Sequence, residues 1–315
     1  GARVTRVAQQ FSQGSVDFTS NNLDLAISGQ GFFVLEGQDG TTSYTRAGAY
    51  SVDRGGNVIN HAGDKLQVYE AIQGASGSTS FNTGVLSDLV LPTGPSTPQA
   101  TGRIDAGLNL NAQSADINAA TVPFDPIDPS TYHSSTSVSV YDSLGNAHAS
   151  TLYFRKVGAN EWEGFQYIDG QAVQNGTPPS DAFTLEFSDT GELLTPANGA
   201  VTMNPFDPLN GAADLDLTLD FSSSTQFGTA FGVNNLAQDG YTSGRLAGVD
   251  IDGEGVIFAR YTNGQSSALG KVALAKFNND QGLRQLGDSA WSETFDSGTA
   301  QLGEAGTSSF GQIQS

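Results

Sequence analysis

Residues 22–33 constrain the fold more than any other part of the chain. Apolar side chains alternate with polar or small ones from residue 23 to 27, and a period of two is typical of a half-buried β-strand. Gly29 and Gly31 then interrupt the alternation, and glycines so close together suit a bulge or a turn with positive φ. An apolar run resumes at residues 32–35. The pattern predicts two strands separated by a kink, with the second strand in a β core.

Turn signals divide the rest of the chain into short apolar alternations. The clearest are Asp39-Gly40, Gly55-Gly56-Asn57, Asp142-Ser143-Leu144-Gly145-Asn146, Asp189-Thr190-Gly191 and Asp252-Gly253-Glu254-Gly255. Glycine accounts for 39 of 315 residues and charged residues for 15%, which suits strands joined by many turns. No three consecutive apolar heptads occur, so long helices are not expected. The sequence predicts an all-β fold, with loops at 73–84 and 228–235 and an extended lead-in at 1–20.

Two shifts in composition indicate where one domain interrupts another. Three prolines fall within residues 92–98, and such a run cannot continue a central strand or a helix. A second stretch of small and polar residues ends near residue 232. We therefore expect two β-rich domains: a compact one at 98–232, inserted into a discontinuous one formed by 1–97 and 233–315.

The chain is strongly acidic. Lys and Arg number 13 against 33 Asp and Glu, for a formal charge of −20, and residues 98–232 hold 16 of the acids and 3 of the bases. This balance disfavours nucleic acid and anionic membranes as partners, and no apolar run approaches the ~18 residues of a membrane span. Leucines at every second position alternate with acids, which predicts a strand with one acidic face: Leu215, Leu217 and Leu219 with Asp214, Asp216 and Asp220.

Candidate metal sites are few. The chain has no cysteine, which excludes disulfides, thiolate metal sites and cysteine nucleophiles. Asp250, Asp252, Glu254 and Gly255 occupy the first, third, fifth and sixth positions of a calcium-loop pattern. The twelfth position is Tyr261, which cannot supply the required bidentate carboxylate. This spacing favours a hairpin turn over a calcium site.

Candidate catalytic residues are equally sparse. The histidines His61, His133 and His148 do not show the close spacing of a zinc site. Glu161 and Glu163 flank Trp162, and on a strand the two carboxylates would lie on one face, about 7 Å apart. Carboxylates near an aromatic can mark a sugar-cleaving site, but an exposed strand shows the same pattern. We assign no catalytic, cofactor-binding or metal site, expect no cofactor and do not expect an enzyme.

Several blocks of sequence resemble the axial proteins of the bacterial flagellum. NNLDLAISGQGFF at 21–33 is similar to the signature that opens the body of rod and hook subunits, and YTRAG at 44–48 resembles the next block. SVYDSLGNAH at 139–148 resembles a block of hook proteins, and residues 240–311, which contain GKVALA, resemble their C-terminal body. The blocks occur in the family's order, and the chain is identified as similar to the core of a flagellar hook protein.

The resemblance implies a structural subunit of the hook, the curved tube that acts as a universal joint between motor and filament. It implies export through the flagellar type III channel, an extracellular location, self-association into a helical tube, and contacts with the distal rod, hook-cap and hook–filament junction proteins. The discontinuous domain would build the tube wall, and the inserted domain would lie outside. The long terminal helices of hook subunits are not found here, so the 315-residue chain by itself is expected to be monomeric.

Two other interpretations remain open at this point. A distal rod subunit of the same family shares the motif at 22–33, although the large insert and the block around Tyr141 favour the hook. A secreted β-rich adhesin or glycan-binding module would also suit the composition.

Overall fold

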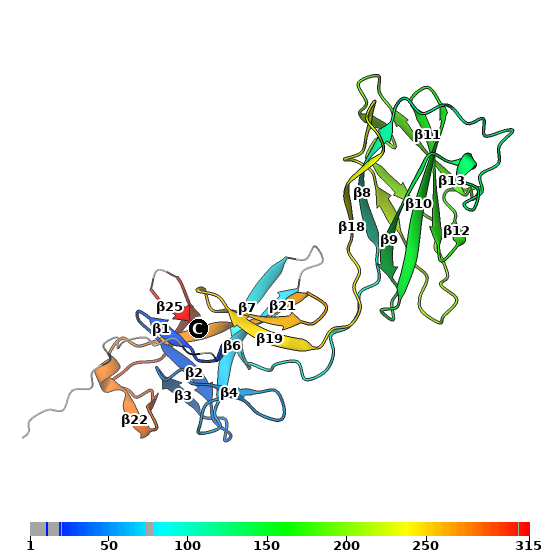
Figure 1. Ribbon diagram of the computed structural model, residues 1–315. Coiled ribbons are helices and arrows are strands. Elements are labelled where there is room, and N and C mark those ends of the chain that lie inside the picture. Colours follow the sequence, from blue (N-terminus) through cyan, green and yellow to red (C-terminus); the bar gives the residue numbers. More distant parts are fainter. Residues whose placement is uncertain (1–10, 12–18, 20, 74–77, 308) are drawn as a thin grey trace, which may run out of the picture. The chain divides into compact units, whose positions relative to one another are not determined.

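The computed structural model describes residues 11, 19, 21–73, 78–307 and 309–315. These residues form β-strands and two short 3-10 helices, η1 (Pro129–Thr131) and η2 (Asp280–Gly282), so the all-β prediction is confirmed. In the described part of the chain, no helix has the length and hydropathy of a membrane span. The chain divides into two compact units, unit 1 (Gly1–Ser96 and Gly244–Ser315) and unit 2 (Thr97–Ser243), each of which is visible in Figure 1.

Unit 1 is built around one large sheet to which both ends of the sequence contribute. Its principal strand order is β19-β20-β21-β6-β2-β3-β23-β22, and β1 pairs with β25 in a separate two-stranded sheet. The strands are β1 (Ala26–Ser28), β2 (Phe32–Glu36), β3 (Thr42–Thr45), β4 (Ser51–Val52), β5 (Val58–Ile59), β6 (Lys65–Gln73), β7 (Thr79–Asp88), β19 (Leu246–Ile251), β20 (Val256–Tyr261), β21 (Ser266–Lys276), β22 (Arg284–Gly287), β23 (Ala290–Ser292), β24 (Gln301–Glu304) and β25 (Gln312–Gln314).

Strand β2 is buried on both of its faces, which explains its unbroken apolar sequence. Phe33 and Leu35 belong to one hydrophobic cluster, whereas Phe32 and Val34 belong to another. The predicted kink precedes this strand, and Gly29 and Gly31 have φ angles of 120° and 132°. Two strands with a positive-φ kink between them are therefore confirmed.

Unit 2 is a pair of sheets packed on one core. One sheet has the order β14-β13-β11-β10-β9 with β12 beside β11, and the other has the order β15-β16-β8-β17 with β18 beside β8. Buried residues of both sheets meet in a single cluster that includes Phe154, Trp162 and Ile104. The strands are β8 (Arg103–Asn111), β9 (Ser134–Tyr141), β10 (Ala147–Gly158), β11 (Glu161–Ile168), β12 (Gln171–Val173), β13 (Ala182–Phe187), β14 (Leu193–Thr195), β15 (Ala200–Thr202), β16 (Thr218–Asp220), β17 (Thr225–Phe227) and β18 (Gly232–Gln238).

Two segments predicted as loops are strands. Residues 79–84 belong to β7, which pairs with β6, and residues 232–235 belong to β18, which pairs with β8 through Leu236 and Ala106. Both strands are largely exposed, so no apolar alternation marks them, and their backbone hydrogen bonds to a neighbour define them instead. Because β18 belongs to unit 2, the second crossing lies at 243/244 and not near residue 232. Of the lead-in at 1–20, all but residues 11 and 19 lies outside the described residues.

The predicted strand with one acidic face is wrong in two respects: only Thr218–Asp220 of this stretch form a strand, β16, and Asp220 does not lie on an open acidic face. Leu215, Leu217 and Leu219 are buried as their alternation predicts. Asp220, however, is only 8% exposed, pairs with Arg103 and accepts the Ser222 backbone N–H at 2.7 Å. Hydrogen bonding to Ser222 and the nearby Arg103 guanidinium hold the pKa of Asp220 below its usual value despite burial. This carboxylate therefore stabilises unit 2 instead of contributing to an open acidic surface.

The position of β18 leads to a testable domain boundary. A fragment of residues 97–243 is expected to unfold cooperatively on its own, whereas a fragment of 98–232 would leave one edge of β8 unpaired. The shorter fragment also lacks Asp239, whose carboxylate accepts the N–H groups of Gly102 and Arg103 at 2.8 and 3.0 Å. Together these losses should lower the free energy of unfolding by at least about 3 kcal/mol, as measured in urea. Equal urea midpoints of unfolding for the two fragments would show that β18 does not contribute to the stability of unit 2.

Candidate functional site

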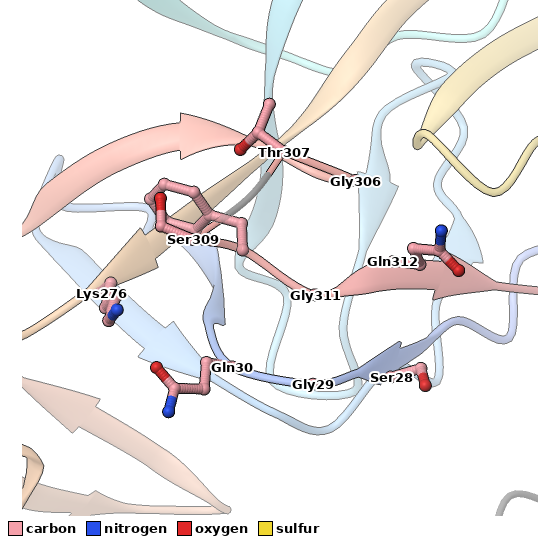
Figure 2. Close-up of a pocket in the computed structure, with 10 residues that line it drawn as sticks. Ser28, Gly29, Gln30, Lys276, Gly306, Thr307, Ser309, Gly311 and Gln312 are labelled. Carbon is pink, nitrogen blue, oxygen red and sulfur yellow. The ribbon is translucent and has the colours of Figure 1, made fainter.

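The Gly29–Gly31 kink borders an open groove of about 570 Å³ in unit 1. Figure 2 shows Ser28, Gly29 and Gln30 along one side, Gly306, Thr307 and Ser309 on the other, and Lys276 at one end. The remaining lining residues are Phe310, Gly311 and Gln312. We call this space the kink groove. Its walls come from the end of β1, the end of β21, and the segment from β24 to β25.

Glycine is needed where the two walls meet. The Gly311 N–H donates to the Gln30 carbonyl at 2.8 Å, and the Gly306 N–H donates to the Gly311 carbonyl at 2.9 Å. A Cβ atom on Gly29 would lie 2.9 Å from the Gly311 Cα atom, closer than a side chain tolerates. Since Gly29 also has a positive φ, only glycine allows this approach without strain.

A smaller pocket of about 250 Å³ adjoins the groove and shares Gly29, Gln30 and Lys276 with it. Arg46 lines this pocket and donates to the Gly29 carbonyl at 2.6 Å and to the Phe11 carbonyl at 3.3 Å. The Phe11 ring packs edge-on against Phe32 and Trp291, each with a centroid distance of 5.3 Å. Arg46 therefore links the Phe11 backbone to the kink, and the Phe11 ring packs on β2 and β23.

Lys276, Asp280 and Arg46 are the charged groups of the two pockets. The Lys276 ammonium forms no ion pair within 4 Å and no hydrogen bond with the described part of the chain. Asp280 is half-buried, burial raises its pKa against the opposing effect of Arg46 and Lys276, and its Oδ1 atom has no hydrogen-bond partner among the described residues. Burial likewise lowers the pKa of Arg46. The kink groove thus offers a lysine ammonium, side-chain amides, backbone groups and the Phe310 ring. Groups of these kinds suit the binding of a polypeptide segment.

The structure uses the calcium-like motif as a turn. Asp252 Oδ1 accepts the backbone N–H groups of Glu254 and Val256, both at 2.9 Å, in the β19–β20 hairpin. Asp250 pairs with Arg260, and Tyr261 lies at the end of β20. Within the described ranges, no group of three or more His, Asp or Glu residues has the arrangement of a metal site.

The structure does not bring the other predicted candidates together. His61 is exposed near Asp288 at 3.7 Å, and the His133 Nε2 atom lies 2.8 Å from the Ala115 carbonyl oxygen. Glu161 is exposed, whereas Glu163 forms an ion pair with Arg155 at 2.6 Å.

His148 is the exception, because it lies in a buried ionic cluster of unit 2. Its Nδ1 atom is 2.6 Å from Asp169 Oδ2, and its Nε2 atom is 3.1 Å from Asp142 Oδ2. Ionised carboxylates only accept hydrogen bonds, so both ring nitrogens donate and the ring is an imidazolium. Burial opposes this charge, but the bonds to the two carboxylates outweigh it and raise the pKa of His148. With both nitrogens occupied, the ring has no free lone pair for proton abstraction.

Sequence reasoning missed the residues that shape the groove. The sequence predicts the kink at Gly29 and Gly31 and places Phe310 in the C-terminal block of the family resemblance, but no motif marks Lys276 or Gln312. The glycine spacing signals that two backbones approach each other, and it does not say which segment supplies the second wall.

Two family models match the chain. Residues 26–119 match the flagellar hook protein FlgE/F/G D1 domain, and residues 109–241 match the flagellar basal body protein FlaE D2 domain. The matched ranges run from the kink through nearly all of unit 2. An all-β chain with these two domains is an axial protein of the bacterial flagellum.

Similar proteins narrow the class further. The chain is 34% identical over 323 aligned residues to flagellar hook protein FlgE of Escherichia coli, covering 99% of this chain and 76% of that protein. It is 33% identical to FlgE of Rhizobium meliloti over 100% of this chain and 75% of that one. The chain therefore belongs to the flagellar hook protein family, and the resemblance seen in its sequence blocks is confirmed. The crystal structure of Helicobacter pylori FlgE2 has the same fold, with a TM-score of 0.66 at 15% identity over 94% of this chain and 98% of that one.

Proposed function

We propose that this chain is the body of a hook subunit, which polymerises into the curved tube that passes motor torque to the filament. The match to E. coli FlgE across 99% of the chain carries this proposal. The relatives described above are named as hook proteins, which favours the hook over a distal rod subunit or an adhesin. We infer that the subunit is exported through the flagellar type III channel and contacts the rod, cap and junction proteins of the same axis.

The two units receive different roles in this proposal. Unit 1 forms the wall of the tube, because strands from the N-terminal and C-terminal parts of the sequence pair within one sheet, as β2 does with β21. Unit 2 is a self-contained insertion with its own core, and it projects to the outside. The site chemistry supports contact and not catalysis, since the kink groove offers recognition groups and the His148 nitrogens are both occupied.

An epitope-labelling experiment tests the location and both roles. A tag after Ile127, which is 88% exposed in unit 2, and a matched tag after Gly264 in a unit 1 turn are placed in the full-length parent protein in a flagellated strain. Gold-labelled antibody should decorate the hook of intact flagella through the Ile127 tag. The Gly264 tag should be labelled much less, because the wall lies beneath unit 2. Label elsewhere on the cell would reject the hook assignment, and equal labelling would reject the division of roles.

A further inference from the structure

Among the described residues, the most exposed aromatic side chain lies in unit 1, in the loop that follows β23. Phe295 is 100% exposed, whereas phenylalanine is normally among the most buried residue types. Scattered exposed aliphatic residues are ordinary on a protein surface. A fully exposed ring is different when its loop is held rigidly, because it then presents a preformed anchor to a partner.

The loop around Phe295 is rigid at both of its ends. The Thr294 N–H donates to Ser297 Oγ at 2.8 Å, and the Ser297 N–H donates back to Thr294 Oγ1 at 3.2 Å. The Thr294 hydroxyl also donates to the Gly282 carbonyl at 2.6 Å, and the Asn279 side-chain amide donates to the Asp296 carbonyl at 3.0 Å. These bonds hold the backbone from Thr294 to Ser297 against η2, while the Phe295 and Asp296 side chains are exposed.

The kink groove is complementary to this pair of side chains. It holds the half-buried Phe310 ring, which offers the edge or face contact that aromatic pairs prefer. It also holds Lys276, whose ammonium lies within electrostatic reach of Asp280 but forms no ion pair within the described part of the chain and suits a further carboxylate. Figure 2 shows the Lys276 and Gln30 side chains at the same end of the groove. The Phe295 ring and the Asp296 carboxylate, on consecutive residues, therefore match the Phe310 ring and the Lys276 ammonium of the groove.

We propose that Phe295 and Asp296 of one subunit dock into the kink groove of a second copy of this chain, with Phe295 against Phe310 and Asp296 against Lys276. This inference rests on the proposed function, because it names a contact within the tube. Phe295 is fully exposed, so it does not occupy the groove of its own subunit. The two surfaces differ, so the contact is heterologous, and repeated heterologous contacts build open helical assemblies.

Disulfide trapping in native hooks tests the contact directly, because the 315 residues contain no cysteine. The full-length parent carrying Asp296→Cys and Ser309→Cys is expressed as the sole hook subunit, and isolated hooks are oxidised. We expect a ladder of covalent oligomers on a denaturing gel. Each single variant, and the pair Asp296→Cys with Gln265→Cys, should give no ladder. Absence of a ladder from well-formed hooks of the first pair overturns the proposal.

Charge reversal supplies a second, independent readout. Phe295→Ala and Lys276→Glu should each lower the number of hooks per cell by about tenfold, as expected for an interface anchor. Lys276→Glu combined with Asp296→Lys should restore hooks, because the ion pair is rebuilt with opposite polarity. Normal hook numbers in both single variants, or failure of the double variant to recover, overturn this contact while the hook assignment stands. Hooks that do not contain the chain at all overturn both.

Discussion

Replacing Phe33 with alanine is expected to lower the free energy of unfolding of unit 1 by about 3–5 kcal/mol, the usual cost of emptying a buried aromatic site. Phe33 is 0% exposed at the centre of β2, and its ring meets Tyr50 edge-on at a centroid distance of 5.7 Å. The strand is buried on both faces, so the surrounding structure has little freedom to collapse into the space. Differential scanning calorimetry measures the effect, and the unfolding temperature of unit 2 should not change.

A matched control lies in the same unit. Phe295→Ala removes the same atoms from a position that is fully exposed, so it should change the unfolding free energy by less than about 0.5 kcal/mol. If Phe33→Ala costs no more than Phe295→Ala, the interior of unit 1 is not organised around β2. An unchanged stability of Phe295→Ala also establishes that any loss of hooks in that variant arises from assembly.

Asp142→Ala is expected to destabilise unit 2 by about 3–5 kcal/mol, the cost of removing one partner from a buried ionic cluster. The Asp142 side chain is fully buried, and its Oδ1 atom accepts the backbone N–H groups of Leu144 and Asn146, both at 2.9 Å. Its Oδ2 atom accepts from Asn210 at 2.6 Å and from the His148 ring. Removing the carboxylate leaves these buried donors without their acceptor, and only Asp169 then remains to neutralise the imidazolium. Asp105→Ala, which breaks an exposed pair with Arg103, should cost less than about 1 kcal/mol.

The same cluster sets a pH dependence for unit 2. The pKa of His148 is raised in the folded state, so its contribution is complete below about 6.5, the ordinary value, and is lost as pH rises through the folded value. The pKa values of Asp142 and Asp169 are lowered, so their contributions are complete above about 4 and are lost as pH falls. Urea midpoints for unit 2 should therefore peak between these limits. His148→Gln should flatten the alkaline side, and an unchanged alkaline slope would contradict the role of the imidazolium.

Local chemistry accounts for the parts of the fold that the sequence predicts. Gly29 and Gly31 mark the kink because few other residues adopt positive φ without strain. Asp252 and Asp142 begin hairpin turns in which each carboxylate accepts backbone N–H groups a few residues ahead. These interactions are complete within five or six consecutive residues, so the sequence contains all the information they need.

Strands and site residues that depend on distant partners cannot be predicted from the local sequence as the turns can. Strands β7 and β18 expose most of their side chains, so they show no apolar alternation and depend on hydrogen bonds to β6 and β8. The kink groove needs Ser28 to meet Gln312 in the β1–β25 register, which no local pattern reveals. Phe295 would be assigned to the core from its type alone, and only the bonds between Thr294 and Ser297 explain why it faces solvent.

The unit 1 sheet combines strands from distant parts of the sequence, and this imposes an order of folding on the chain. Strand β2 needs β21 as a neighbour, with Phe33 opposite Leu274, and the whole of unit 2 is synthesised between them. Unit 2 contains all of its own strands and can close as soon as it is complete. In the N-terminal part of unit 1, β2 can pair with β3 and β6, but the edge at Phe32 and Phe33 must wait for β21. Distant pairings of this kind form slowly, and unpaired strand edges invite association with other chains. A subunit that emerges from its N-terminus first therefore remains vulnerable until its last quarter arrives.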